Sequence, residues 1–457
     1  MSDRTLSSER RIRARMSADA SYPPGPNGVP VVGNTFALSR DIFEFYERLR
    51  EEYGPIASYR VFGTDACMVA HPDAVRRVLL DDHDAFVKGD VLTRNLEDAM
   101  GEGLFVTEGE QWRQQRTRVQ PSFYRERLNT YVPEMRATAS ETVEEWRDGA
   151  VVEANEAMTA TTMKVLGRTL FGVDVTDEPV VADASAAILA RFDTSRFWSF
   201  LPDTVPTPTN RRYRRELDRL REFVDELAAR RRAQSPAERG DDLLSTLVGF
   251  VEASDLSREE FRDNMITFLF AGHETTALGL TYALLCLARN PDEQTRLREE
   301  VDSVCEGAVE ADHLPELERT GRAIDEALRL YPPVYMFFRE AARDVELGGY
   351  EIPAGTTLVL PQWVVHRDAA WWDDPATFRP ERFAGDADRP EYAHFPFGGG
   401  PRHCIGMRFA RMEMKTVLAT ILRDYRFELV SAAEPELVAS SNLKPGEPIE
   451  LRIHERG

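Results

Sequence analysis

The stretch FPFGGGPRHCIG, residues 395–406, places three consecutive glycines and a proline shortly before Cys404 and Gly406 two residues after it. A helical pattern follows from Met407 to Asp424. Glycines let backbone amides come close to a sulfur atom, so these amides and the start of the helix would stabilise Cys404 as a thiolate. Taken alone, the same pattern also fits a buried cysteine beside a glycine-rich turn.

Length and composition indicate either two domains or one large globular body. The chain has 457 residues, of which 42% are apolar and 30% charged, a balance typical of a protein with a substantial core. We find no internal repeat and no low-complexity linker. The sequence therefore predicts a loose polar arm over residues 1–21 and a single folded body over residues 22–457, entered through the proline-rich run Tyr22–Asn34.

The charge of the chain is strongly negative. The formal net charge is −21, and the 57 basic residues comprise 53 arginines and four lysines. An acidic surface repels the phosphates of nucleic acids and of anionic lipids, so neither is expected as a partner. Two explanations stay open: the charge can serve solubility, or it can reflect adaptation to high salt, in which counterions screen the repulsion between Asp and Glu side chains.

The cysteines and the apolar runs bear on the compartment. Cys67, Cys286, Cys305 and Cys404 lie far apart without a CxxC spacing, which disfavours a zinc site or a disulfide framework and favours a reducing cytosol. The longest apolar stretch, Thr275–Ala288, is too short to span a bilayer. A soluble, cytoplasmic protein without a membrane anchor is expected.

Periodic patterns predict a mainly α-helical chain with minor β-sheet. Helices are expected over Asp41–Tyr53, Pro72–Leu80, Trp112–Val119, Leu128–Trp146, Arg211–Arg232, Ser257–Arg289 and Met407–Asp424. A hairpin of two strands is expected over residues 56–71, turning at Gly63, and short antiparallel strands over Val345–Val365. The aromatic, proline-broken segment 191–210 is either a mobile cap over a pocket or an ordinary loop.

The helix Ser257–Arg289 is the most clearly delimited element. Ser257 and Glu260 match a capping box, and Pro291 closes the far end. At about 1.5 Å per residue the helix would be roughly 50 Å long, so we expect it to be the central strut of the fold.

Within this helix the segment AGHETT combines small residues with polar ones. Ala271 and Gly272 stand one turn before Thr275 and would leave a gap in the side of the helix. Glu274 and Thr275 are a carboxylate and a hydroxyl, the groups that organise water and transfer protons. The alternative is a helix kink with a solvated glutamate.

Two further pairs share a helix face. Trp112 and Arg116 lie one turn apart, where an indole N–H and a guanidinium could both reach carboxylates, and Glu326 and Arg329 lie three residues apart. An ordinary surface ion pair would also explain the second pair. Of the eight histidines none shares a metal-ligand spacing with another, so none is assigned as a ligand.

The segment around Cys404 resembles the haem-binding loop of the cytochrome P-450 superfamily. The matching positions are Phe397, Gly400, Arg402, Cys404 and Gly406. AGHETT resembles the oxygen-activating segment of the same family, and the resemblance spans roughly Tyr22 to Leu429. It implies that Cys404 is the proximal axial ligand of a haem iron, in which thiolate ligation favours cleavage of the O–O bond.

The resemblance also implies roles for the other motif residues. Ala271 and Gly272 would border an oxygen-binding groove, and Glu274 and Thr275 would deliver protons. A structural lock on the cysteine side of the haem would consist of Glu326, Arg329 and Arg382. The haem propionates would be neutralised by Trp112, Arg116, Arg339 and Arg402.

The fold that the resemblance implies is a triangular prism that holds haem b between the long helix and the cysteine loop. The implied activity is insertion of one atom of dioxygen into a small apolar substrate of the fatty acid, terpenoid or steroid class, with pocket walls at residues 88–107, 192–200 and 334–338. Electrons would come ultimately from NAD(P)H, through a ferredoxin or a flavodoxin with its reductase, because we expect no fused reductase domain. A monomer is expected.

Three other functions are compatible with parts of the pattern. A haem-thiolate isomerase or peroxide-driven enzyme would need no proton relay, which the Glu274–Thr275 pair argues against. A haem or gas sensor would be expected to carry a signalling domain. A cysteine hydrolase with Cys404 as nucleophile would need a histidine base in a triad-like context, which the sequence does not offer.

Overall fold

The computed structural model describes residues 22–175, 179–192, 205, 207–235, 238–385 and 388–456. They group into two compact units: the first holds the chain up to Asn95 with Val334–Ala376 and Asp388–Cys404, and the second holds Leu96–Pro333, Thr377–Ala387 and the chain from Ile405. The chain passes between the units five times. The predicted arm and most of the predicted cap lie outside the described residues, and the single body over residues 22–457 stays a prediction.

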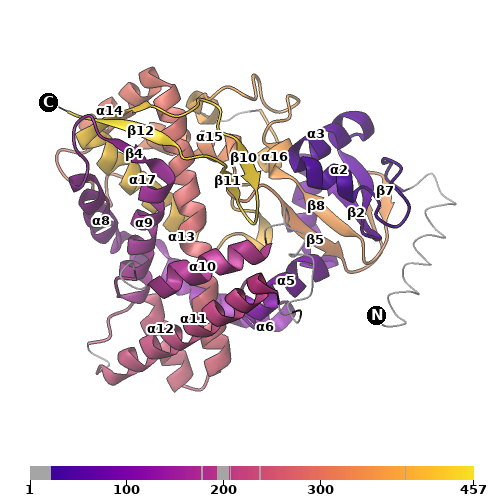
Figure 1. The fold of residues 1–457 in the computed structure, drawn as a ribbon, viewed down its shortest axis with the longest axis horizontal. Helices are drawn as coiled ribbons and strands as arrows, with labels where there is room; N and C mark the ends of the chain where they lie inside the picture. The colour runs from indigo at the N-terminus through magenta and orange to yellow at the C-terminus, as the bar shows by residue number, and fades with distance from the viewer. Residues whose placement is uncertain are drawn as a thin grey trace. The chain divides into compact units, whose positions relative to one another are not determined.

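The first unit is built on a five-stranded sheet of order β1-β2-β8-β5-β3 (Figure 1). Its strands are β1 (Ile56–Val61), β2 (Thr64–Val69), β8 (Thr357–Leu360), β5 (Phe337–Ala341) and β3 (Phe86–Val87). The predicted hairpin is confirmed, because Val61 pairs with Thr64 across a turn formed by Phe62 and Gly63. Gly63 has φ +82°, a conformation that glycine adopts without strain.

The prediction of antiparallel strands over Val345–Val365 is only partly right. β6 (Val345–Leu347) and β7 (Tyr350–Ile352) form an antiparallel pair. β8 pairs antiparallel with β5 on one side but parallel with β2 on the other, and Gln362–Val365 form the short helix α16. All four residues of β8 are buried, so the strand lacks the in–out alternation from which a partner could have been predicted.

Short helices surround this sheet. They are α2 (Thr35–Arg40), α3 (Ile42–Tyr53), α4 (Pro72–Arg76), the π-helical turn η1 (Arg77–Asp81) and the 3-10 turns η2 (His83–Ala85), η7 (Glu391–Ala393) and η8 (Gly400–Arg402). The carboxylate of Asp41 caps α3, which ends at Gly54 as predicted. Helix α5 (Asp90–Met100) occupies part of the segment 88–107, which the sequence analysis expects to be a pocket wall, and it continues into the second unit.

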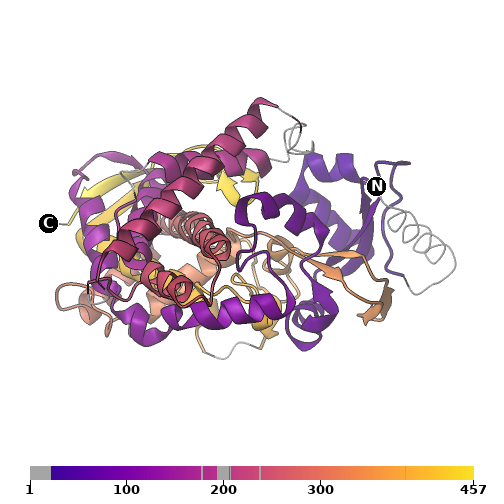
Figure 2. The ribbon, with the colours of Figure 1, turned by 90° about the horizontal axis from the view of Figure 1, so that it is seen from below.

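The second unit is mainly helical. Its helices are α6 (Gly109–Val119), α7 (Arg125–Asn129), α8 (Val132–Glu144), α9 (Ala154–Leu166), α10 (Pro179–Phe192), α11 (Pro208–Ala233), α12 (Leu243–Glu252), α13 (Arg258–Arg289), α14 (Pro291–Val304), α15 (Glu318–Leu330) and α17 (Met407–Asp424), with the turns η3 (Gln120–Phe123), η4 (Gly167–Phe171) and η6 (Pro380–Phe383). α10 packs along α11 (Figures 1 and 2). Two small sheets join it: β4 (Val151–Glu153), β12 (Glu450–Glu455) and β9 (Tyr425–Leu429), and the hairpin of β10 (Leu437–Ala439) and β11 (Leu443–Pro445).

The long helix α13 is the core of this unit, as predicted. Ser257 and Glu260 form the expected capping box, and α13 packs on α9, α11, α15 and α17. Among the described residues, no helix has both the length and the apolar character that crossing a membrane requires. The helix predicted over Leu128–Trp146 is wrong in one respect: α7 ends at Asn129 and α8 begins at Val132, with Pro133 in its first turn, because proline cannot sit inside a helix without breaking it.

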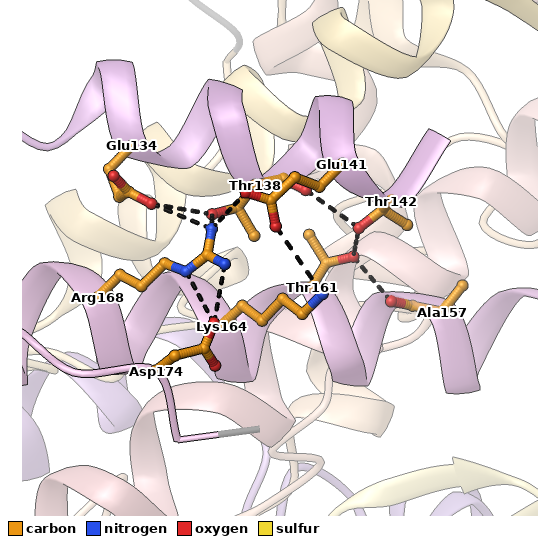
Figure 3. Close-up of polar contacts among 9 residues, drawn as sticks. All are labelled: Glu134, Thr138, Glu141, Thr142, Ala157, Thr161, Lys164, Arg168 and Asp174. Atoms are coloured by element: carbon orange, nitrogen blue, oxygen red, sulfur yellow. Dashed lines mark hydrogen bonds and ion pairs between the residues drawn. The ribbon is translucent and has the colours of Figure 1, made fainter. Parts of the chain in front are cut away.

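An arginine with three carboxylate partners ties α8 to the end of α9 (Figure 3). The guanidinium of Arg168, in η4, donates to Glu141 at 2.7 Å, to Glu134 at 3.3 Å and to Asp174 at 2.8 Å. Nearby, Lys164 lies 3.9 Å from Glu141. The hydrogen bond from Arg168 holds the pKa of Glu141 below its usual value. Arg168 thus neutralises carboxylates that would otherwise repel one another.

We expect Arg168→Met to destabilise the protein by about 1 kcal/mol at pH 7, since its partners are partly exposed and solvent screens the pairs. A carboxyl with a lowered folded-state pKa contributes stability above its unfolded pKa of about 4.3 and loses that contribution as the pH falls through the folded-state value. The difference between variant and wild type should therefore shrink below about pH 4. Urea unfolding at pH 7 and below pH 4 measures this difference in the free energy of unfolding. Arg48→Met is the control, because the Arg48–Glu52 pair is solvent-exposed and simple and its loss should change little; equal effects of both variants would contradict the cluster's role.

Candidate functional site

The cysteine loop lies in the first unit and is held by close backbone contacts. The backbone N–H of Cys404 donates to the carbonyl of Phe397 at 2.9 Å. Gly400 has φ +62°, and a Cβ atom placed on it would lie 1.8 Å from the carbonyl oxygen of Leu79 in η1. A side chain at this position is therefore impossible without moving the backbone, and the loop takes its shape from that close approach.

The thiol of Cys404 differs from the other three in its surroundings. Cys67, Cys286 and Cys305 are buried, whereas Cys404 is exposed. Burial raises the pKa of Cys67 to about 12 and also raises that of Cys305, so these thiols are poor ligands for a metal. Of the four, Cys404 is the one that the fold makes accessible. Gly406 directly precedes the first residue of α17 as its N-cap.

The two predicted arginines of the first unit are both half-buried. Arg402 belongs to η8, two residues before Cys404. Arg339 lies in β5 opposite Leu358 of β8, and its guanidinium donates to the carbonyl of Phe338 at 2.7 Å. The neighbouring Phe337 ring lies 3.3 Å from the position of a Cβ on Gly398, so this strand packs against the glycine-rich segment.

In the second unit the middle of α13 is accessible. Between Asp263 and Ala288 the buried run of the helix is interrupted only in the section Phe270–Thr275, where His273 alone is buried. Ala271 is exposed, as a groove would require. A Cβ on Gly272 would lie 2.7 Å from Leu166 of α9, so the missing side chain allows the two helices to approach each other. The place of Gly272 beside an oxygen groove stays a prediction.

The side chains of Glu274 and Thr275 point to different partners. The hydroxyl of Thr275 donates to the carbonyl of Ala271 at 3.1 Å. Glu274 accepts a hydrogen bond of 2.6 Å from the amide of Asn442 through Oε2 and contacts the ammonium group of Lys444 through Oε1. Sequence reasoning missed Asn442 and Lys444, because no local pattern links residues about 170 positions apart.

His273 is buried in the helical core and makes local contacts. Its ring nitrogen Nδ1 lies 2.8 Å from the carbonyl of Leu269, and burial lowers the pKa of its imidazole. The carbonyl of His273 accepts from the hydroxyl of Thr162 at 3.1 Å, a further link between α13 and α9.

The three residues of the predicted lock do come together, within the second unit. Glu326 accepts from Nε of Arg329 at 2.7 Å and from Nε of Arg382 at 2.8 Å. The backbone N–H of Arg379 also donates to Glu326, at 3.0 Å. Side chains of Glu326 and Arg329 are fully buried, and burial lowers the pKa of Arg382. These contacts fix α15 to η6.

The remaining predicted pair lies on α6. Trp112 is half-buried and packs against the helical core, and Arg116, one turn later, is buried. The segment that precedes α6 is tied to the long helix, since Asp263 accepts from the backbone N–H of Glu102 at 2.8 Å and Asn264 from that of Leu104 at 3.0 Å. α6 therefore follows a loop that α13 holds in place.

Comparison with known proteins agrees with the mainly α fold and with the glycine-rich cysteine loop. A family model described as Cytochrome P450 matches residues 23–452. The chain belongs to the cytochrome P450 family, and its expected mainly α fold and P450 monooxygenase class are confirmed. Membership implies a haem iron and the use of dioxygen.

Two relatives are bacterial oxygenases. Pentalenene oxygenase of Streptomyces avermitilis is 34% identical over 438 residues, which cover 94% of this chain and 97% of the relative. Cyclooctat-9-en-7-ol 5-monooxygenase of Streptomyces melanosporofaciens is 34% identical over 431 residues, which cover 90% of this chain and 93% of the relative.

Glu326→Gln should destabilise the protein by about 3–5 kcal/mol, because Arg329 and Arg382 would be left buried without a compensating charge. The midpoint of urea unfolding measures this loss. Glu293→Gln is the matched control: Glu293 is also buried between two arginines, but Arg296 and Arg319 reach solvent, with side chains 55% and 31% exposed. A cost for Glu326→Gln no larger than that of the control would refute the role of the buried contacts.

Proposed function

We propose that the protein is a haem-dependent monooxygenase that inserts one atom of dioxygen into a small apolar organic molecule, with Cys404 as the axial ligand of the haem iron. The observation that carries this proposal is the exposed Cys404 thiol on a loop whose glycines admit no side chain at Gly400. When bound, haem b would supply the redox-active iron for dioxygen chemistry, and Cys404 would hold that iron.

The residues present fit such a group. Phe397, Gly400 and Gly406 shape the loop on either side of the ligand. A haem also carries two carboxylates, and guanidinium groups bind carboxylates through two parallel hydrogen bonds. The cationic and indole donors that would hold these propionates are Trp112, Arg116, Arg339 and Arg402.

Two residues of α13 would manage protons. Thr275 and Glu274 lie in its accessible section, beside the exposed Ala271, which would border the space for oxygen. We assign to the Thr275 hydroxyl the orientation of water near the reacting oxygen, and to the Glu274 carboxylate the supply of protons to that water. The Glu326–Arg329–Arg382 cluster, in which the side chains of Glu326 and Arg329 are fully buried, would keep the fold on the cysteine side rigid.

The substrate that we propose is a terpenoid. Two relatives of this chain, by their names, oxidise pentalenene and cyclooctat-9-en-7-ol, and the broader prediction of a fatty acid, terpenoid or steroid narrows accordingly. We further propose that electrons come from NAD(P)H through a ferredoxin or flavodoxin and its reductase, and that the protein works as a cytoplasmic monomer. With a net charge of −21, docking of an acidic electron carrier would need salt screening or a local cluster of arginines.

The reduced protein with carbon monoxide should show the red-shifted Soret band of a haem with a thiolate ligand. Cys404→Ser should lose that band, because a hydroxyl is not deprotonated as a thiol is. Cys305→Ser, which changes a buried thiol, is the control and should retain it. A folded, haem-loaded wild type without the band would refute the ligation.

Thr275→Ala should still bind haem and substrate but should release more of its reducing equivalents as hydrogen peroxide, by about tenfold or more if the hydroxyl takes part in proton transfer. Oxygen uptake and peroxide are measured during NADPH-driven turnover with a surrogate ferredoxin and reductase. Thr276→Ala is the control, since Thr276 is buried whereas Thr275 is half-buried; both hydroxyls donate within α13, to Gly272 and Ala271. Unchanged peroxide in Thr275→Ala would remove this residue from the mechanism.

A further inference from the structure

We propose that Lys444 and Asn442, on the C-terminal hairpin β10–β11, are positioning residues that hold the Glu274 carboxylate for proton delivery. The inference rests on the role proposed above for Glu274. Both hairpin residues act through that carboxylate, and neither is assigned a contact with substrate or cofactor.

The first support is that the hairpin occupies both carboxylate oxygens. Asn442 donates to Oε2 at 2.6 Å, and the ammonium of Lys444 contacts Oε1. The Glu274 side chain is only 13% exposed and that of Lys444 is 29% exposed. A sheltered carboxylate with two donors has one preferred orientation, whereas a lone solvated carboxylate would sample many.

The second support is that the hairpin itself is anchored to α13. Leu443, between the two donors, is fully buried. Its carbonyl accepts from the hydroxyl of Tyr282 at 3.0 Å, and its N–H donates to the carbonyl of Pro333 at 2.8 Å. Tyr282 lies eight residues after Glu274 on the same helix, so the hairpin is attached to α13 at two points about two turns apart. A donor pair on a fixed support can position a side chain with precision that a mobile loop cannot give.

The third support is the type of cation. The chain contains only four lysines among its 57 basic residues, yet a lysine stands here. An ammonium group is a compact charge with donors that rotate, while a guanidinium is a planar fork that prefers to bind both oxygens of a carboxylate. Because Asn442 already donates to Oε2, the cation binds at Oε1, and an ammonium group can bind one oxygen alone.

The consequence for function is that the Glu274 carboxylate is held in one orientation, directed toward the partly exposed Lys444. In this arrangement protons from solvent reach the carboxylate by way of the lysine side of the hairpin. Without Lys444 the Glu274 carboxylate would lose its charged partner and its orientation. Protons would then arrive more slowly at the water that Thr275 orients.

The test compares Lys444→Met, Asn442→Ala and Lys444→Arg with a matched control, Lys164→Met. Lys164 also faces a glutamate, Glu141, and its side chain is 26% exposed (Figure 3), but it has no assigned part in proton delivery. Melting temperatures of the haem-loaded proteins are measured for Lys444→Met in the wild type and in Glu274→Gln. We expect Lys444→Met to lower the melting temperature by about 1–2 °C in the wild type and by clearly less in Glu274→Gln.

During NADPH-driven turnover with a surrogate ferredoxin and reductase and pentalenene as probe, Lys444→Met should raise the peroxide released per oxygen consumed by about threefold or more. It should also enlarge the solvent deuterium isotope effect on oxygen uptake. Asn442→Ala should act in the same direction. Lys444→Arg should give values between those of the wild type and of Lys444→Met, because it keeps the positive charge but replaces the single-point donor with a planar fork. Lys164→Met should leave the values unchanged.

The proposal would be overturned if Lys444→Met released as much peroxide as the wild type and showed the same solvent isotope effect. This holds even if the change in melting temperature depends on Glu274, since the pair would then be only structural. The proposal would also be overturned if Lys444→Met lowered the melting temperature equally in the wild type and in Glu274→Gln, because Lys444 and Glu274 would then not interact. Failure of the proposed function would appear separately, as the loss of the thiolate band in the wild type with carbon monoxide, and the melting experiment would still test the contact.

Discussion

The close approach of the Gly400 backbone to the carbonyl oxygen of Leu79 governs the geometry of the cysteine loop. Because no Cβ fits between them, the loop lies directly on η1, and the backbone N–H of Cys404 can turn back to Phe397. The thiol is thereby left exposed while the loop that carries it remains ordered. An accessible sulfur on a rigid support is what an axial ligand requires, since a mobile ligand would lose entropy whenever it bound the metal.

In the second unit, polar side chains lie in the middle of a helix, α13, that otherwise belongs to the apolar core. Most of α13 between Asp263 and Ala288 is buried, so its carbonyls and side chains must be satisfied locally or by neighbours. Thr275 turns to Ala271, and Thr162 satisfies the carbonyl of His273. Glu274 relies on a charged partner from elsewhere in the chain. The accessible section therefore holds a carboxylate whose orientation depends on the C-terminal hairpin.

Elements that depend on contacts between near neighbours in the sequence could be predicted, whereas elements that depend on long-range contacts could not. The capping box of α13, the Gly63 hairpin and the extent of α17 depend on neighbours within a few residues, so the sequence sufficed. The parallel pairing of β8 with β2, and the π-helical turn after α4, are set by tertiary packing. Of the site, the sequence indicated Cys404, Thr275 and the Glu326 cluster, whose members carry local motifs. Lys444 and Asn442 carry none, and only folding brings them to Glu274.

The Glu274–Lys444 and Glu326–Arg329 pairs show how burial decides which cation suits a carboxylate. At Glu326 the carboxylate is fully buried, and two arginines satisfy its lone pairs through several hydrogen bonds, which favours rigidity. At Glu274 one oxygen meets an amide and the other a half-exposed ammonium, so the pair keeps a route to solvent. A carboxylate that must only hold helices together gains from complete enclosure. A carboxylate that exchanges protons during turnover, as we propose for Glu274, cannot be enclosed completely, and a partly exposed lysine meets both demands.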